Sequence, residues 1–154
     1  MRRMVVGIVL AVMLTSEAVA GPFEDGVAAH SSGDYATAAR IWRPLAEQGN
    51  SRAQNNLGLM YDEGQGVLQD DAEAVKWYRF AAEQGNAPAQ LNLGLMYAKG
   101  KGVPQDYVQA HMWANLAAAN GNDTAAMVID ITAAQMTPEQ IAEAQKLARE
   151  WKPK

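Results

Sequence analysis

The chain has 154 residues, of which 49% are hydrophobic and 19% charged, and its formal net charge at pH 7 is −4. This apolar content excludes wholesale disorder, and a single apolar run near the N-terminus excludes a protein that crosses a membrane many times. Because the chain has no cysteine, disulfides, zinc fingers and thiol nucleophiles are excluded as well. The mild acidity argues against a nucleic-acid partner, since phosphate binding requires a basic surface.

The first 20 residues have the pattern of a cleaved secretory signal. Arg2 and Arg3 precede an uncharged apolar run at residues 4–14, and Ala18-Val19-Ala20 fits the small-x-small rule of signal peptidase. This run is too short to cross a hydrocarbon core, which needs about 20 residues. We therefore predict an exported protein without stable membrane insertion, in the bacterial periplasm or, alternatively, outside the cell. Residues 21–154 carry a formal charge of −5 and predict one domain.

A repeat of 36 residues organises the rest of the chain. Residues 51–86 and 87–122 align without a gap and are identical at 19 of 36 positions. Repeats of this length are typical of stacked arrays, in which each unit covers the apolar face of its neighbour. Weaker matches extend the array to an atypical N-terminal unit at residues 21–50 and to C-terminal capping helices at residues 123–154. About four antiparallel helix hairpins account for nearly the whole domain.

The expected helices follow one another in chain order. In the N-terminal unit they cover residues 23–32 and 34–48, and in the first complete unit residues 51–62 and 70–84, with a glycine-containing turn between them. Asp70 is predicted to cap the second of these helices, with Glu73 completing a variant of the capping box. The core faces are predicted from the helical period at Ala53, Gln54, Leu57, Gly58 and Tyr61, and at Ala74, Trp77, Tyr78 and Ala81.

Glycines mark both the ends and the contacts of these helices. Gly85 is predicted to end one helix in the left-handed conformation, and Asn86 to cap the next, so that almost no linker separates them. Gly58 and Gly94 recur in mid-helix, where each costs about 1 kcal/mol relative to alanine, so we expect a partner helix too close for a β-carbon. After a helix at residues 123–135, a capping box at residues 137–140 opens the last helix.

The second complete unit carries the motif Ala-Gln-x-Asn-Leu-Gly-x-Met-Tyr, followed by Gly-x-Gly-Val-x-Gln-Asp-Tyr and by Ala-Ala-x-Asn-Gly-Asn. This pattern resembles the Sel-like repeat family, which is related to the tetratricopeptide repeats. The resemblance implies an all-α, right-handed α-solenoid that acts as an adaptor for other proteins, with no cofactor and no metal. Some cysteine-rich exported members are associated with β-lactam binding, and this chain lacks their cysteines.

The predicted binding surface is the side of the first helices opposite the core. In the tetratricopeptide fold this side lines a concave groove, so the resemblance implies a groove that is polar toward the N-terminus and apolar toward the C-terminus. The predicted partner-binding residues are Arg52, Asn55, Leu59, Asp62, Leu91, Leu95 and Lys99. Lys99 lies at the rim, where it can pair with a carboxylate of the partner. An ordinary solvated surface is the competing interpretation of these positions.

No catalytic site is predicted. Asp70, Asp71 and Glu73 cluster at a helix start, where capping explains them, and the glycines around Lys101 repeat with the period and predict a turn instead of a phosphate loop. His111 aligns with a valine of the preceding unit, which predicts a partly buried packing histidine, and His30 lies in a different unit. The recurrent aromatic residues Tyr61, Trp77, Tyr97 and Trp113 are predicted to pack in the interior.

The sequence therefore predicts a non-catalytic adaptor or scaffold of the cell envelope, which binds another protein or a peptide of unidentified sequence. Two alternatives stay open. One is an envelope hydrolase acting on cell-wall or β-lactam substrates, which would need a closed pocket with a strongly perturbed titratable group. The other is a homo-oligomeric scaffold that forms by self-association.

Overall fold

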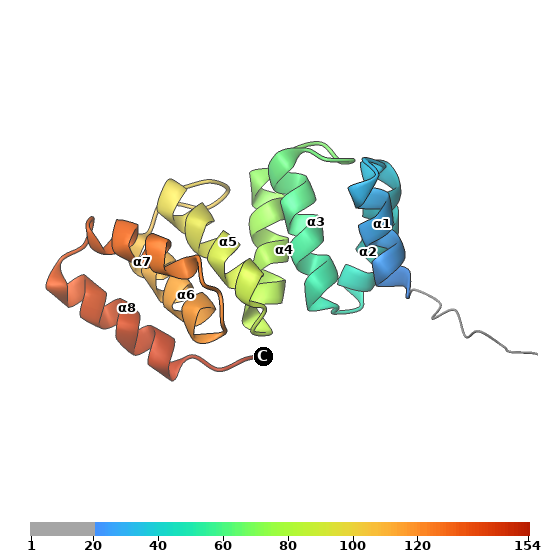
Figure 1. Cartoon of the computed structure of the whole chain (residues 1–154). Coiled ribbons are helices and arrows are strands. Elements are labelled where there is room, and N and C mark those ends of the chain that lie inside the picture. Colours follow the sequence, from blue (N-terminus) through green and yellow to red (C-terminus); the bar gives the residue numbers. More distant parts are fainter. Residues whose placement is uncertain (1–20) are drawn as a thin grey trace, which may run out of the picture.

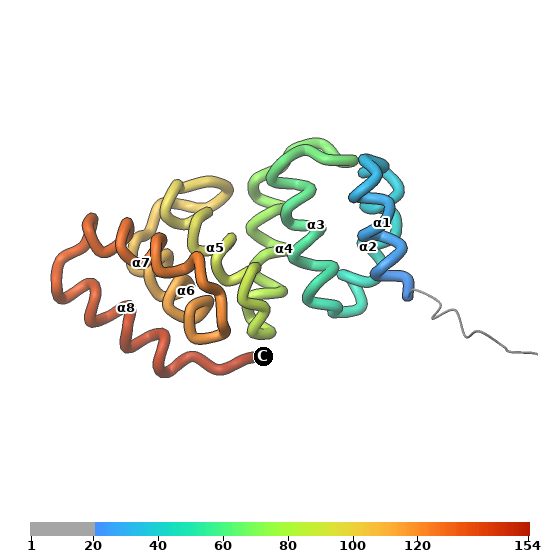
Figure 2. The backbone as a smooth tube through the Cα atoms, in the orientation of Figure 1, coloured from blue at the N-terminus to red at the C-terminus, as the bar shows by residue number. Residues whose placement is uncertain are grey.

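Eight helices follow one another in this computed structural model, which describes residues 21–154, and the described residues contain no strand. The predicted signal at residues 1–20 lies outside the described part of the chain. The helices are α1 (Pro22–Ser31), α2 (Tyr35–Glu47), α3 (Ser51–Glu63), α4 (Asp71–Glu83), α5 (Ala87–Lys99), α6 (Tyr107–Ala119), α7 (Ala125–Ala133) and α8 (Pro138–Glu150). They stack side by side in an elongated array with α1 and α2 at one end and α7 and α8 at the other (Figures 1 and 2). The predicted all-α solenoid with a 36-residue repeat is confirmed.

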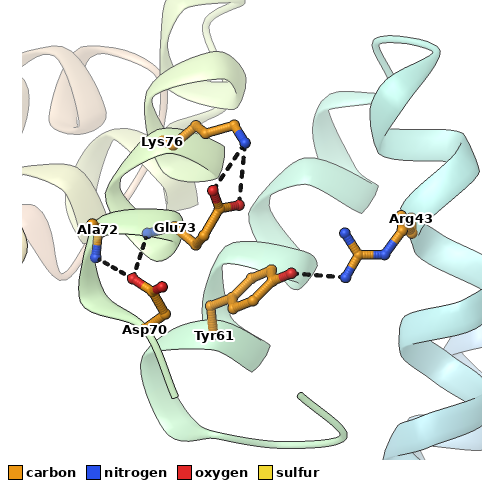
Figure 3. Close-up of polar contacts among 6 residues, drawn as sticks. All are labelled: Arg43, Tyr61, Asp70, Ala72, Glu73 and Lys76. Atoms are coloured by element: carbon orange, nitrogen blue, oxygen red, sulfur yellow. Dashed lines mark hydrogen bonds and ion pairs between the residues drawn. The ribbon is translucent and has the colours of Figure 1, made fainter. Parts of the chain in front are cut away.

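The helix starts follow from their caps. The side chains of Asn50 and Asn86 accept hydrogen bonds from backbone N–H groups three residues on, as does Asp70 at the start of α4. The capping box predicted for Glu73 is wrong, because its carboxylate turns to Lys76, with N–O distances of 3.0 and 3.2 Å, instead of returning to the cap (Figure 3). At α8 the box between Thr137 and Gln140 is present in both directions.

The mid-helix glycines mark where α3 and α5 approach their partner helices. A β-carbon on Gly58 would lie 2.7 Å from the buried ring of Tyr78 in α4. On Gly94 it would lie 3.1 Å from the backbone oxygen of Ala110 in α6. The expected close approach is confirmed, because a larger residue at either position would require the partner helix or its side chain to shift.

The turn glycines join successive units. Gly66 and Gly102 have φ values of +69° and +66°, and a β-carbon on either would overlap backbone atoms at the start of the second helix of the preceding unit. For Gly66 that backbone belongs to Tyr35 in α2, and for Gly102 it belongs to Asp71 in α4. Each turn therefore sits directly on the neighbouring unit, a contact that the repeat pattern alone does not reveal.

Polar side chains also repeat at the joints between units. Gln54 and Gln90 are buried and donate to the backbone oxygens of Ala46 and Ala82, at 3.0 and 3.2 Å. Each accepts in turn from a residue at the end of the following second helix. These bonds satisfy the buried amides and fix the rotation of each unit against the one before it.

The predicted aromatic core is partly confirmed. Trp77 and Trp113 are each 6% exposed and belong to the two clusters that form the core. Tyr61 and Tyr97 are only half-buried, because their rings pack on the core while their hydroxyls reach its edge. There the hydroxyl of Tyr61 accepts a hydrogen bond of 2.7 Å from Arg43 (Figure 3), and that of Tyr97 accepts one of 2.9 Å from an arginine one repeat later.

The C-terminal helices depart from the hairpin plan. Both α7 and α8 pack on α6, and α8 does not lie along α7 in the way that α4 lies along α3. Asp130 occupies in α7 the place of Gly58 and Gly94, and its side chain is exposed. The close approach seen at the two glycines is therefore absent from this last unit. The chain then crosses back, so that Trp151 packs on Trp113 and the backbone N–H of Lys154 donates to the oxygen of Glu83 at 2.8 Å.

Candidate binding surface

The side of α3, α5 and α7 that points away from the core carries the predicted binding residues. We call it the first-helix face and define it by the two positions that recur every 36 residues, which are Asn55, Leu91 and Met127 at one and Leu59, Leu95 and Ile131 at the other. Asn55, Leu59, Leu91 and Leu95 are half-buried. The structure therefore brings these four predicted residues onto one surface that is neither core nor fully solvated.

The polar residues of this surface bond to other residues of the same chain. Asn55 accepts a hydrogen bond of 3.1 Å from Asn92, which joins α3 to α5. Asp62 lies 2.7 Å from the ammonium of Lys101, which also lies 3.5 Å from Asp71. The hydrogen bond that the ammonium of Lys101 donates to Asp62 raises the pKa of Lys101 above its usual value. These residues brace one unit against the next, so they are poorly placed to contact a partner.

Arg52 is held more weakly. Its guanidinium lies 3.6 Å from a carboxylate oxygen of Glu24 and 3.9 Å from the centre of the Phe23 ring in α1. Both charged side chains are more than half exposed, so the ion pair contributes little to stability. Arg52 thus lies over the ring of Phe23 in α1, and its guanidinium can leave Glu24 to pair with another carboxylate.

The apolar part of the surface is open. A hollow of about 320 Å³ lies between α5 and α7, and Leu95, Lys99, Ile131 and Thr132 are among the residues that line it. Lys99 is exposed and has no ion-pair partner among the residues that the structure describes. An apolar hollow with one free cation at its edge can accept an apolar side chain next to a carboxylate.

Met127 and Ile131 belong to this surface, and the sequence reasoning missed them. Their side chains are 63% and 56% exposed, which is unusual for large apolar residues. They lie 36 residues after Leu91 and Leu95, so one further step of the repeat leads to them. That signal is weak, because the unit after residue 122 has lost the other residues of the motif.

A second, smaller hollow lies at the equivalent place two units earlier. It has a volume of about 130 Å³, lies between α1 and α3, and is lined by Val27, His30, Trp42, Asn56 and Leu59. Leu59 stands 72 residues before Ile131, and Val27 stands 72 residues before Lys99. The Nε2–H of His30 donates to Gln65 at 3.0 Å. Recurrence at this spacing shows that the gap between successive first helices is a product of the repeat.

The histidine in α6 has a packing role. His111 is 1% exposed, so it is more deeply buried than the sequence predicted. Its Nδ1 lies 2.9 Å from the hydroxyl of Thr132, which itself donates to the backbone oxygen of Val128 at 2.8 Å. The hydroxyl can then only accept from Nδ1–H, so the proton of the neutral ring lies on Nδ1. Burial lowers the pKa of His111 accordingly.

Tests for other kinds of site are negative within the described residues. Residues 21–154 contain no group of three or more histidine, aspartate or glutamate side chains that could hold a metal ion. None of the helices described there is long and apolar enough to cross a membrane.

Comparison with known proteins assigns the repeat. The model of the Sel1 repeat matches residues 51–86 and again residues 87–122, the two complete units. Residues 51–122 are two Sel1 repeats. Members of this family are typically non-catalytic scaffolds for protein–protein interaction. No curated protein sequence matches the chain.

Two solved structures have the same fold. One is c5321, a protective antigen present in uropathogenic Escherichia coli strains that displays an SLR fold, with 33% identity and a TM-score of 0.81 over 84% of this chain. The other is a Sel1 repeat protein from Oxalobacter formigenes, with 30% identity and a TM-score of 0.67 over 89% of this chain. This chain spans 29% of the first protein and 61% of the second.

Proposed function

We propose that this Sel1 repeat protein is a non-catalytic adaptor of the cell envelope, whose first-helix face binds another protein or a peptide. The observation that carries the proposal is the recurrence of apolar residues outside the core, at Leu59, Leu95 and Ile131, beside the two hollows. Core packing does not explain these positions, because the first-helix face points away from both core clusters. Apolar residues that gather beside surface hollows are typical of interaction sites.

The internal bonds of the polar residues favour the same conclusion. The pair of Asp62 and Lys101 and the pair of Asn55 and Asn92 each join α3 to the following unit. A surface braced in this way changes shape little on binding, so it loses little conformational entropy when a partner docks. Specificity then comes from Leu59, Leu91, Leu95 and Lys99, with Met127 and Ile131 added by the structure.

The envelope location rests on the N-terminal pattern. A positive region, an apolar run and a small-x-small site are the three parts of an export signal, and they precede the first described helix directly. We propose the periplasm as the compartment and no chemical step as part of the function. His111, one of the groups that an envelope hydrolase could use as a base, is buried, and its Nδ1 is hydrogen-bonded to Thr132.

The proposal is tested by in-cell crosslinking followed by mass spectrometry of the captured proteins. The variant Leu91→Asp with Leu95→Asp places two charges on the first-helix face and should abolish capture. Leu68→Asp is the matched control, because Leu68 is 91% exposed at a turn and lies off this face. The control should capture the same proteins as the wild type, and circular dichroism should show that both variants are folded. Unchanged capture by the double variant would refute the proposal.

A further inference from the structure

One side of α7 is apolar and uncovered. The residues exposed on it are Ala126, Met127, Asp130 and Ile131, together with the C-cap residue Ala134. They follow the spacing i, i+1, i+4, i+5 and i+8, which forms a single stripe along a helix. In the complete units the second helix of the hairpin lies along the first, whereas α8 packs on α6 and leaves this stripe open.

Charges of opposite sign lie on the two sides of the ridge that Met127 and Ile131 form on this stripe. Lys99 and Ile131 both line the hollow between α5 and α7, and Asp123, Asp130 and Ile131 all line a second hollow of about 500 Å³ on the other side. Val128 lines the first hollow together with Lys99. At 100° per residue, Val128 lies about 60° to one side of Ile131, and Asp130 lies about 100° to the other side. The uncovered surface therefore runs from positive through apolar to negative.

A surface of this kind is complementary to itself. Rotation by 180° about an axis through its apolar centre brings the positive side of one copy against the negative side of another, which is the geometry of a two-fold dimer. We infer that α7 pairs with α7 of a second copy of this chain, with Met127 and Ile131 packed at the axis and Lys99 facing the Asp130 of its partner copy.

The local shape of α7 suits this occupant. Met127 and Ile131 are four residues apart and form one ridge, and the small Ala134 beside it leaves a groove for the ridge of the other copy. A second copy of the chain supplies both charges in the complementary order by symmetry. The inference does not depend on the proposed function, because it requires no foreign partner.

The size of the surface sets the expected strength. A helix of nine residues is about 14 Å long, so the pairing buries less area than a standard interface and falls in the range of weak, reversible complexes. We expect a monomer–dimer equilibrium that shifts with protein concentration. The dimer should also dissociate as salt is added, because two exposed charge pairs contribute to it.

The test is sedimentation velocity with charge-reversed variants of the purified protein. Lys99→Glu brings two carboxylates together at both charge pairs of the dimer, and Asp130→Lys brings two ammonium groups together there. Each variant alone should therefore dimerise about tenfold more weakly than the wild type. An equimolar mixture of the two variants can form a mixed dimer with two favourable charge pairs. One pair joins the introduced glutamate to the introduced lysine, and the other joins the native lysine to the native aspartate. The mixture should recover the dimer that neither variant forms alone.

Two controls distinguish the α7–α7 dimer from nonspecific association. Leu68→Asp alters an exposed leucine elsewhere and should leave the equilibrium unchanged, whereas Ile131→Ser should weaken it without altering any charge. Lys99, Asp130 and Ile131 are all exposed, so the variants are expected to fold, which thermal unfolding checks. A wild-type protein that is monomeric at every concentration overturns the inference, and so does a mixture that sediments like its separate components.

Discussion

Replacing Gly102 with alanine tests whether the turn after α5 holds one repeat against the next. Gly102 has a φ of +66°, and an alanine in the left-handed region costs about 1–2 kcal/mol. Its β-carbon would also overlap the backbone oxygen of Asp71 at the start of α4, and forced overpacking costs about 1–3 kcal/mol more. Together these effects predict a loss of about 2–5 kcal/mol in the free energy of unfolding.

Gly85→Ala is the matched control, because it shares the positive φ but not the contact. Gly85 has a φ of +90°, and a β-carbon there meets nothing within 4 Å. Only the conformational cost of about 1–2 kcal/mol should appear. In a domain of this size 1 kcal/mol corresponds to about 4 °C in Tm, so we expect Gly85→Ala to lower Tm by about 4–8 °C and Gly102→Ala by about 8–20 °C.

Thermal unfolding followed by far-ultraviolet circular dichroism measures both values. Urea titration gives the free energies independently and shows whether the transition is still cooperative. If the two variants lost the same stability, the contact between the turn and α4 would contribute nothing, and the proposed joint between repeats would be refuted.

Three further predictions concern buried and paired side chains. Burial lowers the pKa of His111, so the unfolded chain takes up a proton there before the folded chain does as the pH drops below about 6.5. The Tm of the wild type should therefore fall between about pH 7.5 and about pH 5, and His111→Val should flatten this fall. Parallel curves for the two proteins would contradict this prediction. Gln90→Ala should cost about 1–3 kcal/mol in urea titration, since it leaves the oxygen of Ala82 without its side-chain donor, and an unchanged midpoint would contradict it. Lys101→Met should lower the free energy of unfolding by about 0.5–1 kcal/mol, and by less at high salt. Lys99→Met breaks no ion pair among the described residues and should leave the free energy of unfolding almost unchanged. Equal effects of the two variants would show that the ion pair between Lys101 and Asp62 does not stabilise the contact between units.

The central hairpins could be predicted from the sequence because their determinants are local or recur. Caps such as Asn86, the helical period, and the glycines at 58 and 94 are all visible in one pass along the chain, and each leads to a single geometry. The end of the array is harder to place. The sequence predicts a helix over residues 123–135, but α7 covers only Ala125–Ala133, because Asn122 accepts from the backbone N–H of Thr124 and holds the chain in a turn.

The candidate surface could be predicted in its position but not in its partners. The angular argument places Asn55 and Asp62 on the correct side of α3, yet it treats that helix alone. Their partners Asn92 and Lys101 lie 37 and 39 residues further along. Lys101 reaches Asp62 only because the turn that carries it sits on the preceding unit. A contact of this kind depends on how two units stack, which a helical wheel does not contain.

Asp130 connects the end of the solenoid with its exposed apolar surface. At the same position of the complete units, Gly58 and Gly94 lie against the second helix of their hairpin. No second helix of its own unit lies against Asp130, because α8 packs on α6, where Ala144 and Trp151 join the core cluster that contains Trp113. Met127 and Ile131 continue the pattern of Leu91 and Leu95, but they do so on a helix without its usual cover. Asp130 and the most exposed apolar residues of the first-helix face thus lie together on the one first helix that the second helix of its own unit does not cover.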